Sequence, residues 1–204
     1  TLLNTISKHW ISIILVTTLL LGASVAVTAL QPFEYRSTFS LLLIEKNSNL
    51  DAFAAAKSAE RASLSIGQIL YTTSFFDQVK ETGLLDPTLF PDDEQERRRA
   101  WERQIETRVF PDVGMVKISA YDANQERANT LSYALATVLA KNGADYLGGG
   151  RNIVLKVVDA PLTSKTPVRP NVPMNLALGF LVGFGGSVAF HLVQESQRER
   201  QGRR

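Results

Sequence analysis

Side chains that could carry acid–base or metal chemistry are few in this sequence and poorly placed for it. The histidines, His9 and His191, lie beside long apolar runs at opposite ends of the chain, so the charged middle part has no histidine base. The carboxylates of that middle part fall on expected helices, caps and turns, at spacings that suggest no acid–base pair. Among them are Asp77, Asp112, Asp122, Glu126 and Asp145. We therefore expect no catalytic residue and no enzyme activity.

Binding motifs for cofactors and metals are also missing from the sequence. It has no nucleophile elbow, Walker loop, dinucleotide fingerprint or paired metal-ligand motif. The glycines at 148–150 end a predicted helix instead of opening one after a strand, so they do not form a phosphate loop. Because the chain has no cysteine, disulfides and thiolate metal sites are excluded. The sequence predicts no cofactor and no metal.

The charge pattern argues against nucleic acid as a partner. The formal net charge is only +2, and the basic residues are scattered among acidic ones, whereas a nucleic-acid binder needs a basic stripe. The arginines at 97–99 form the densest basic run, which is either a binding patch or a solvated helix face. Glutamates three and four positions away favour the solvated face. They are Glu94, Glu96, Glu102 and Glu106.

A long apolar segment near the start of the chain is expected to anchor it. Residues 11–30 carry no charged side chain, and as a helix they are long enough to cross about 30 Å of hydrocarbon. The alternative is a cleaved signal peptide, with 27–29 as a possible cleavage motif. The apolar run exceeds the roughly 7–15 residues of a signal core, so we predict a transmembrane helix over 11–30 behind a cytoplasmic end over 1–10.

A second apolar segment, residues 174–193, passes the same length test near the end of the chain. His191 falls near its end, where headgroups and water accommodate a titratable ring, so we interpret it as interfacial. The tail over 194–204 contains a basic cluster, which the positive-inside rule places in the cytoplasm. The cluster comprises Arg198, Arg200, Arg203 and Arg204. Both termini are then cytoplasmic, and residues 31–160 form an extracytoplasmic domain.

Small residues recur in both apolar segments at the spacing used by packed membrane helices. Gly179 and Gly183 form a GxxxG motif, followed by Gly186, and the first segment has Gly22 and Ala26 four residues apart. Glycine lets helix backbones approach closely where lipid offers no hydrophobic drive between helices. We therefore predict that these residues pack against a partner helix. The partner is either the other helix of this chain or a neighbouring copy.

The first half of the middle domain is predicted to contain one strand and three helices. Residues 34–46 are rich in β-formers and read as a strand, with 41–44 buried on both faces. Helices are expected over 51–63 and 66–82, the second ending at Gly83, and a charged helix over 94–107.

Strands and one long helix are predicted in the second half of the domain. Strands are expected at 109–110 and 115–121 around a turn, followed by a helix that Asp122 caps and 148–150 end, and a last strand over 153–158. The predicted fold is a membrane α+β protein. Two transmembrane helices flank an extracytoplasmic α/β domain that has a small mixed sheet and a long C-terminal helix.

The most specific stretch of the sequence is 157–186, VVDAPLTSKTPVRPNVPMNLALGFLVGFGG. A strand ending in Asp-Ala-Pro leads through a proline-rich connector into Asn175 and a glycine-containing apolar helix; the prolines are Pro161, Pro167, Pro170 and Pro173. This pattern resembles the signature of the Wzz-like polysaccharide co-polymerases, the chain-length determinant proteins. The prolines predict a stiff, extended juxtamembrane segment over 161–173. Proline spacers are also common outside this family.

The resemblance covers the whole chain in order. The family begins with a membrane helix followed at once by a strand, as residues 11–46 do, and has a strand leading into a helix that resembles 119–128. The chain lacks the long helical insertion of the O-antigen regulators and is therefore similar to the shorter capsule and exopolysaccharide branch. Part of that branch carries or pairs with a cytoplasmic tyrosine kinase, so such a kinase is a candidate partner, although no Walker motif or tyrosine-rich tail follows Arg198.

The resemblance implies a non-catalytic scaffold of the bacterial inner membrane. Such proteins assemble with copies of themselves as rings, and they set how many repeat units a Wzy-like membrane polymerase adds to a lipid-linked glycan. The product is an O-antigen, a capsule or an exopolysaccharide, and the main domain lies in the periplasm. The sequence leaves open the glycan, the ring size, the envelope type and whether residues precede Thr1.

Other functions fit parts of the pattern. A two-helix sensor would place a ligand-binding domain outside the membrane, but it needs a cytoplasmic output domain larger than 194–204. A structural adaptor of a secretion complex should show long heptad helices, which are absent. An anchored enzyme is disfavoured by the missing site chemistry.

Overall fold

The computed structural model describes residues 2–46, 51–147 and 153–201. The chain separates into two compact units: Thr1–Phe33 with Arg169–Arg204, and Glu34–Val168. We call the first the helix pair and the second the sheet domain. The predicted domain boundaries at 30/31 and 160/161 therefore move to 33/34 and 168/169, because the last strand and the segment after it belong to the sheet domain.

The helix pair consists of α1 (Leu2–Ala29) and α6 (Val172–Gln201). Within them Thr5–Ala29 and Val172–Gln197 are long enough and apolar enough to cross a membrane, by length and composition. Both helices extend beyond the predicted 11–30 and 174–193, so each runs on past its apolar stretch. His9 has non-helical backbone angles (φ −116°, ψ 19°), which kink α1 where its apolar stretch begins.

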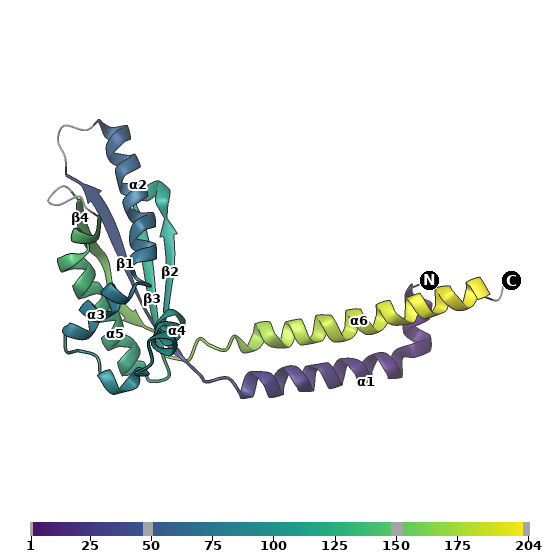
Figure 1. Cartoon of the computed structure of the whole chain (residues 1–204). Helices are drawn as coiled ribbons and strands as arrows, with labels where there is room; N and C mark the ends of the chain where they lie inside the picture. Colours follow the sequence, from purple (N-terminus) through teal and green to yellow (C-terminus); the bar gives the residue numbers. More distant parts are fainter. Residues whose placement is uncertain (1, 47–50, 148–152, 202–204) are drawn as a thin grey trace. The chain divides into compact units, whose positions relative to one another are not determined.

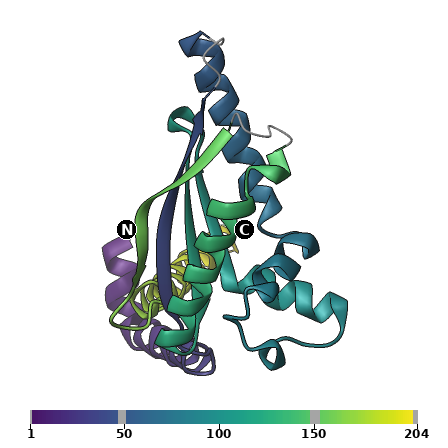
Figure 2. The same ribbon diagram turned by 90° about the vertical axis from the view of Figure 1, so that its left-hand side faces the viewer.

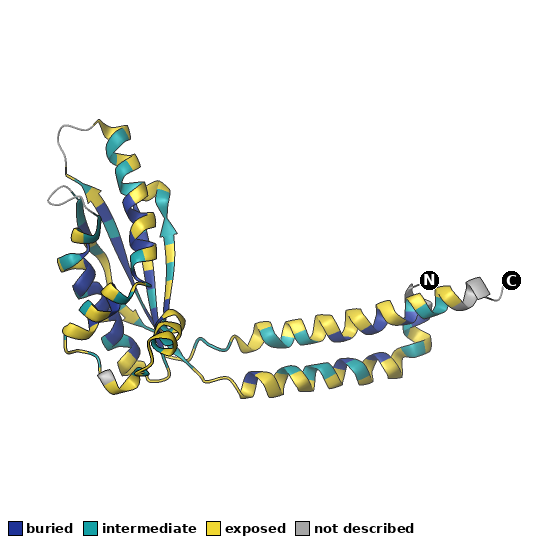
Figure 3. Cartoon of the chain, viewed as in Figure 1, coloured by how far each residue is buried: buried dark blue, intermediate teal, exposed yellow. Residues whose placement is uncertain are grey.

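Exposure in the helix pair is the reverse of that in a water-soluble bundle. Large apolar side chains are exposed along both helices, and Figure 3 colours much of both helix ribbons as exposed. Leu15 on α1 and Leu181 on α6 are each 63% exposed. The residues that the pair buries include the small polar Thr17, Thr28 and Ser187 as well as the apolar Ile13 and Val188.

The sheet domain contains a four-stranded antiparallel sheet in the order β2-β3-β1-β4. The strands are β1 (Tyr35–Glu45), β2 (Ile105–Phe110), β3 (Met115–Asp122) and β4 (Ile153–Thr163). The prediction of a mixed sheet is wrong, because every neighbouring pair runs antiparallel. A tight turn joins β2 to β3, which forces their antiparallel pairing.

The turn between β2 and β3 lies at the predicted position. Pro111–Val113 forms one turn of 3-10 helix, and Gly114 follows in the left-handed conformation (φ 62°) that glycine adopts without strain. The Gly114 N–H donates to the Pro111 carbonyl at 3.0 Å, and the Gly114 carbonyl accepts from the Leu43 N–H at 2.9 Å. A Cβ at Gly114 would lie 3.0 Å from Ala59 Cβ, so the turn is also packed under a helix.

Helices α2 (Ala52–Ile69) and α3 (Thr73–Glu81) replace the predicted helices over 51–63 and 66–82. The boundary lies at 70–72 because the Thr72 hydroxyl caps α3, accepting from the Phe75 N–H. The Leu70 carbonyl, free of the helix ladder, accepts from the indole Nε1 of Trp101 at 2.8 Å. Gly83 has a positive φ of 69° and ends this helical segment as predicted.

The ends of α4 (Glu94–Gln104) and α5 (Gln125–Asn142) also differ from the prediction. Residues 105–107, predicted to be helical, belong to β2, because the strand lets the Ile105 side chain pack in the hydrophobic core. Asn124, rather than Asp122, caps α5, and α5 ends at Asn142 rather than at the glycines of 148–150, which lie outside the described residues.

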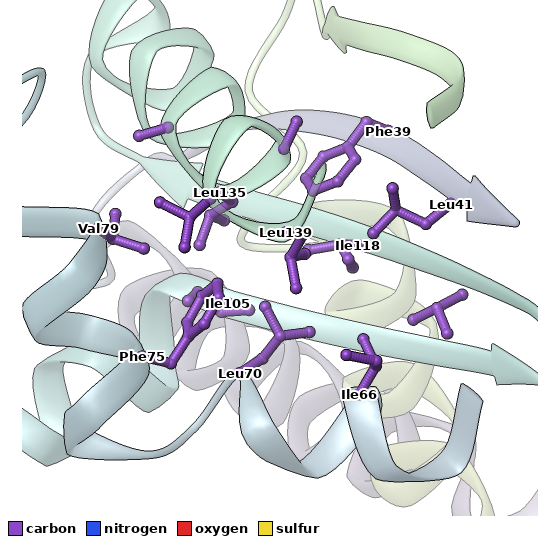
Figure 4. Close-up of a cluster of buried hydrophobic side chains, with 14 of the residues drawn as sticks. Phe39, Leu41, Ile66, Leu70, Phe75, Val79, Ile105, Ile118, Leu135 and Leu139 are labelled. Atoms are coloured by element: carbon purple, nitrogen blue, oxygen red, sulfur yellow. The ribbon is translucent and has the colours of Figure 1, made fainter. Parts of the chain in front are cut away.

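In the sheet domain, helices α2 and α5 cover one face of the sheet. Helix α5 packs on β1, β3 and β4, and α2 packs on β1, β2 and β3; Figure 2 shows the helices gathered on one side of the strands. Alternate strand residues such as Phe39, Leu41 and Ile118 point into this layer (Figure 4). The predicted apolar face of α5 is confirmed, since Leu131, Leu135 and Leu139 are all buried there.

The opposite face of the sheet carries no helix of this domain. The prediction that 41–44 is buried on both faces is therefore wrong: Leu41 and Leu43 are buried, whereas Ile44 is exposed. Strand β4 also runs five residues beyond the predicted 153–158, and it ends at Thr163 opposite Ser37 of β1. Pairing shifts register near Pro161, as expected for a residue that cannot donate to the ladder on an edge strand.

Candidate functional site

Helices α1 and α6 lie side by side and run in opposite directions (Figure 1). Their contacts step regularly from one end of the pair to the other. They join Thr5 to Glu195, Ser12 to His191, Thr17 to Gly183, Ser24 to Gly179 and Thr28 to Asn175. Each of these contacts uses a hydroxyl, an amide, a charged group or a glycine.

Gly179 and Gly183 form the closest approach between the helices. A Cβ added at Gly179 would lie 2.8 Å from Ser24 Cβ, and one at Gly183 would lie 2.9 Å from Thr17 Cα. Real Cβ atoms do not come this close, so any larger residue would push the helices apart. The GxxxG motif therefore packs against the other helix of the same chain.

Asn175 hydrogen-bonds the start of α6 to the end of α1. These are the helix ends next to the sheet domain in the sequence. The Nδ2 of Asn175 donates to Thr28 Oγ1 at 3.1 Å, and its backbone carbonyl accepts from Ser24 Oγ at 2.8 Å. The Thr28 hydroxyl in turn donates to the Ser24 carbonyl at 2.7 Å. In an apolar surrounding such bonds hold helices together, because water does not compete for the donors.

Polar contacts also close the opposite end of the pair. The Thr5 hydroxyl donates to Glu195 Oε2 at 2.6 Å, and Ser12 Oγ lies 3.1 Å from His191 Nε2. The His9 and His191 rings stack at 4.3 Å between centroids and are nearly parallel. His191 was predicted to be interfacial; here it is 9% exposed and packed against α1.

Three of the five small residues predicted to pack are exposed in the single chain, so packing of these three against a neighbouring copy stays a prediction. Gly22, Ala26 and Gly186 lie on exposed faces of the pair, and a Cβ at Gly22 or Gly186 would meet nothing within 4 Å. Spacing alone could not tell which small residues face the partner, since both helices carry several such steps.

The prolines of the connector occupy different kinds of structure. Pro161 lies in β4, Pro167 lies exposed between β4 and α6, and Pro170 follows a cis peptide bond. Pro173 lies in the first turn of α6, where its missing N–H costs nothing. The N–H of Met174 bonds Asn171 Oδ1 at 3.1 Å, which makes Asn171 the cap of α6.

Part of the connector, which was predicted to be stiff and extended, is hydrogen-bonded to the sheet domain. Backbone hydrogen bonds tie residues 164–168 to the start of β1: the Ser164 N–H donates to the Arg36 carbonyl and the Val168 N–H to the Glu34 carbonyl, each at 2.8 Å. Further residues of the connector thus continue the edge of the sheet domain beyond the end of β4.

Metal-binding and acid–base sites do not emerge among the residues that the structure describes. No group of three or more His, Cys, Asp or Glu side chains there could hold a metal ion. In the sheet domain the pKa of Asp86 lies below its usual value, because the Thr88 hydroxyl and N–H both donate to its carboxylate. This is the geometry of a local turn.

The sheet domain has a hollow on the face that no helix of this domain covers among the residues that the structure describes. The hollow measures about 770 Å³ and is lined by residues of all four strands. Sequence analysis missed it, because the strands that form it are far apart in sequence and only their register brings the side chains together.

Comparison with known proteins adds no relative: no family model matches the chain, and no curated protein matches it.

Proposed function

We propose that this chain is a membrane-anchored, non-enzymatic scaffold of the polysaccharide co-polymerase type. In this proposal copies of the chain assemble in a bacterial inner membrane and set the length to which a Wzy-like polymerase extends a lipid-linked glycan. The proposal joins the sequence resemblance over 157–186 to the geometry of the helix pair.

The reversed exposure of the helix pair supports a membrane anchor. Leu15, Leu181 and Leu30 are 63%, 63% and 86% exposed, and exposed apolar surface costs about 25 cal/mol per Å² in water. Lipid removes that cost. Lipid also explains why hydroxyls and an amide gather between the helices, where each finds a partner.

The antiparallel pairing supports a topology with both chain ends on one side. If α1 and α6 both cross the bilayer, residues 34–168 are connected to the ends that emerge on the other side. The arginines of the tail then favour the cytoplasm for both termini, and the sheet domain lies in the periplasm.

One observation carries the co-polymerase proposal further than an anchor alone. Asn175 and Gly179 belong to the stretch that resembles the family signature, and both lie in the contact between α1 and α6. In this proposal the role of the stretch is to fix the spacing of the two membrane helices.

The test compares glycines on one helix that do and do not contact its partner. Gly179→Leu and Gly183→Leu should shift the length distribution of the surface polysaccharide, resolved on a gel from a strain that depends on this chain. Gly185→Leu and Gly186→Leu are matched controls, since a Cβ at either meets nothing within 4 Å. An unchanged distribution in the first two variants contradicts the proposal.

A sensor remains the second candidate, favoured by the hollow on the sheet. A ligand of ordinary size fits a space of about 300–1,000 Å³, and the hollow measures about 770 Å³. The oligomer after mild extraction separates the candidates. A closed ring of many copies supports the scaffold, whereas a stable monomer or dimer supports the sensor.

A further inference from the structure

The uncovered face of the sheet presents its side chains in ordered rows. The strands alternate, so the residues opposite to the core-facing set point to this face. One row crosses all four strands, from Arg108 through Lys117 and Ser40 to Asp159. The next row contains Glu106, Ser119, Thr38 and Leu162.

Arg108 and Lys117 are directly opposite each other on β2 and β3. Like charges in this position destabilise a sheet, because their Cβ atoms lie only about 4.5–5.5 Å apart. Both side chains are exposed, and neither has an ion-pair partner among the residues that the structure describes. The guanidinium of Arg108 lies over the Phe110 ring, 5.2 Å from its centroid, which holds it on this face.

A third cation and a line of hydroxyls border the same hollow. Arg36, exposed at the start of β1, pairs with Tyr121 in the register. The hydroxyls of Thr38 and Ser119 bond each other at 2.9 Å. Further hydroxyls come from Ser40, Thr163 and Ser164, which also line the hollow.

Two acidic residues, Glu106 and Asp159, line the same hollow beside the cationic pair. Glu106 accepts a hydrogen bond from the Tyr121 hydroxyl at 2.6 Å, which occupies part of its acceptor capacity. Asp159 lies on the edge strand, and Ser40 separates it from Lys117 in the row. An anion between Arg108 and Lys117 would therefore relieve their repulsion.

We propose that this hollow binds an acidic polysaccharide. Arg108 and Lys117 hold a carboxylate or phosphate group of the glycan, and the neighbouring hydroxyl row bonds its sugar hydroxyls. Arg36 binds a second acidic group further along the strand direction. The inference rests on the proposed function, because it assigns the glycan contact to this domain.

The chemistry of the face favours a glycan over a second copy of the chain. Protein interfaces are depleted in lysine and acidic residues at their centres. This hollow, in contrast, has Lys117 and Asp159 in the row that runs from Arg108 to Asp159. Guanidinium groups suit carboxylate and phosphate through paired N–H donors. Partly buried hydroxyls in the same lining supply further donors and acceptors for the hydroxyls of a sugar chain.

Binding by the full chain in phosphatidylcholine nanodiscs tests the site. The probes are polygalacturonate, which carries carboxylates, and polyribitol phosphate, which carries phosphates, with neutral dextran as reference. We expect at least one acidic polymer to bind at least tenfold more tightly than dextran. Binding should weaken with added salt, since exposed charges are screened.

Substitutions locate the binding on the sheet. Arg108→Gln with Lys117→Gln should lower the affinity for the acidic polymer at least tenfold and leave Tm unchanged or higher, because the repulsion is gone. Lys117→Arg should retain binding. The control Lys80→Gln with Arg99→Gln removes two exposed charges from the helical layer and should change affinity less than twofold.

Several results would overturn the site. They are equal binding of dextran, unchanged affinity in the double variant, a Tm that falls together with affinity, and tighter binding to phosphatidylglycerol vesicles than to either polymer. Polysaccharide length in cells separates this inference from the proposed function. If the Arg108 and Lys117 double variant loses polymer binding but polysaccharide length is unaltered, the site is supported and the proposed function is contradicted. If no acidic polymer binds but the Gly179 and Gly183 variants alter polysaccharide length, only the site is contradicted.

Discussion

The helix pair and the sheet domain place the same residue types in opposite positions. In the sheet domain Leu135 is fully buried and the charged side chains lie outside, whereas in the helix pair Leu181 is 63% exposed and hydroxyls lie inside. The difference supports the proposal that the helix pair lies in lipid, whereas the sheet domain has the interior of a water-soluble fold. Water drives the first arrangement, and an apolar surrounding stabilises the second.

The contacts that hold each unit together differ in the same way. The core of the sheet domain is filled by large side chains, with the rings of Phe76 and Trp101 packed edge to face at 5.0 Å. The helix pair uses Gly179 and Gly183, where backbone meets backbone. Large buried side chains stabilise the sheet domain, whereas the absence of side chains at the glycines lets the two helices of the pair pack closely.

Removing a leucine side chain should therefore have opposite consequences in the two units. Leu135→Ala leaves a cavity and should cost about 2–5 kcal/mol of unfolding free energy. Leu181→Ala leaves no cavity and should change stability by less than about 0.5 kcal/mol. Urea unfolding of the full chain in detergent, followed by Trp101 fluorescence in a Trp10→Phe background, measures both. Equal losses would break the contrast.

Adding a side chain between the two helices should destabilise the helix pair, just as removing one destabilises the core of the sheet domain. Gly183→Leu places a Cβ 2.9 Å from Thr17 Cα, and overpacking of this kind costs about 1–3 kcal/mol. Because the chain has no native cysteine, a short thiol cross-linker between Ser12→Cys and His191→Cys reports the pairing. Its yield should fall with Gly183→Leu and stay unchanged with Gly185→Leu. A fall in both variants would point to general disruption instead.

Removing one interhelical hydrogen bond should have a smaller effect. Asn175→Ala loses the bond to Thr28 and should weaken the pair by about 0.6–2 kcal/mol. Ser187→Ala is the control, because the Ser187 hydroxyl bonds the Phe184 carbonyl of its own helix. The temperature at which the yield of the same cross-link falls should be lower for Asn175→Ala than for wild type. It should be unchanged for Ser187→Ala. The reverse order would contradict the assigned contact.

The smallest effect is expected at the surface of the sheet domain. Asp86 has a pKa lowered by hydrogen bonds from Thr88, so its contribution to stability is present above the ordinary value of 3.8 and is lost as pH falls through the lowered pKa. Thr88→Ala should raise the pKa of Asp86 toward 3.8. A carboxyl NMR titration measures the change, and an unaltered pKa would remove the hydroxyl as its cause.

Much of the architecture follows from local patterns in the sequence. The apolar period of α5 and the alternation of β3 predict their buried faces, and Gly114 predicts the turn between strands. Element ends were predicted less well where tertiary contacts decide them. The boundary at 70–72 depends on Trp101 reaching the Leu70 carbonyl, and the start of β2 depends on Ile105 entering the core.

The candidate sites divide in the same manner. The GxxxG spacing singled out Gly179 and Gly183, but the same spacing also selected Gly22 and Ala26, which face outward. Only the rotation of each helix about its axis distinguishes them. The opposition of Arg108 and Lys117 was invisible for a similar reason, because it depends on the register between strands that pair through the turn at Gly114.

Cysteine accessibility tests the central claim, that the helix pair crosses a bilayer with the sheet domain on one side and both termini on the other. The chain offers a cysteine-free background, so Lys8→Cys, Lys141→Cys and Gln197→Cys can each be probed with a membrane-impermeant maleimide on intact spheroplasts. We predict that Lys141→Cys is labelled at once and that the other two are labelled only after lysis. Labelling of Lys8→Cys and Gln197→Cys on opposite sides, or protection of Lys141→Cys, would contradict the account.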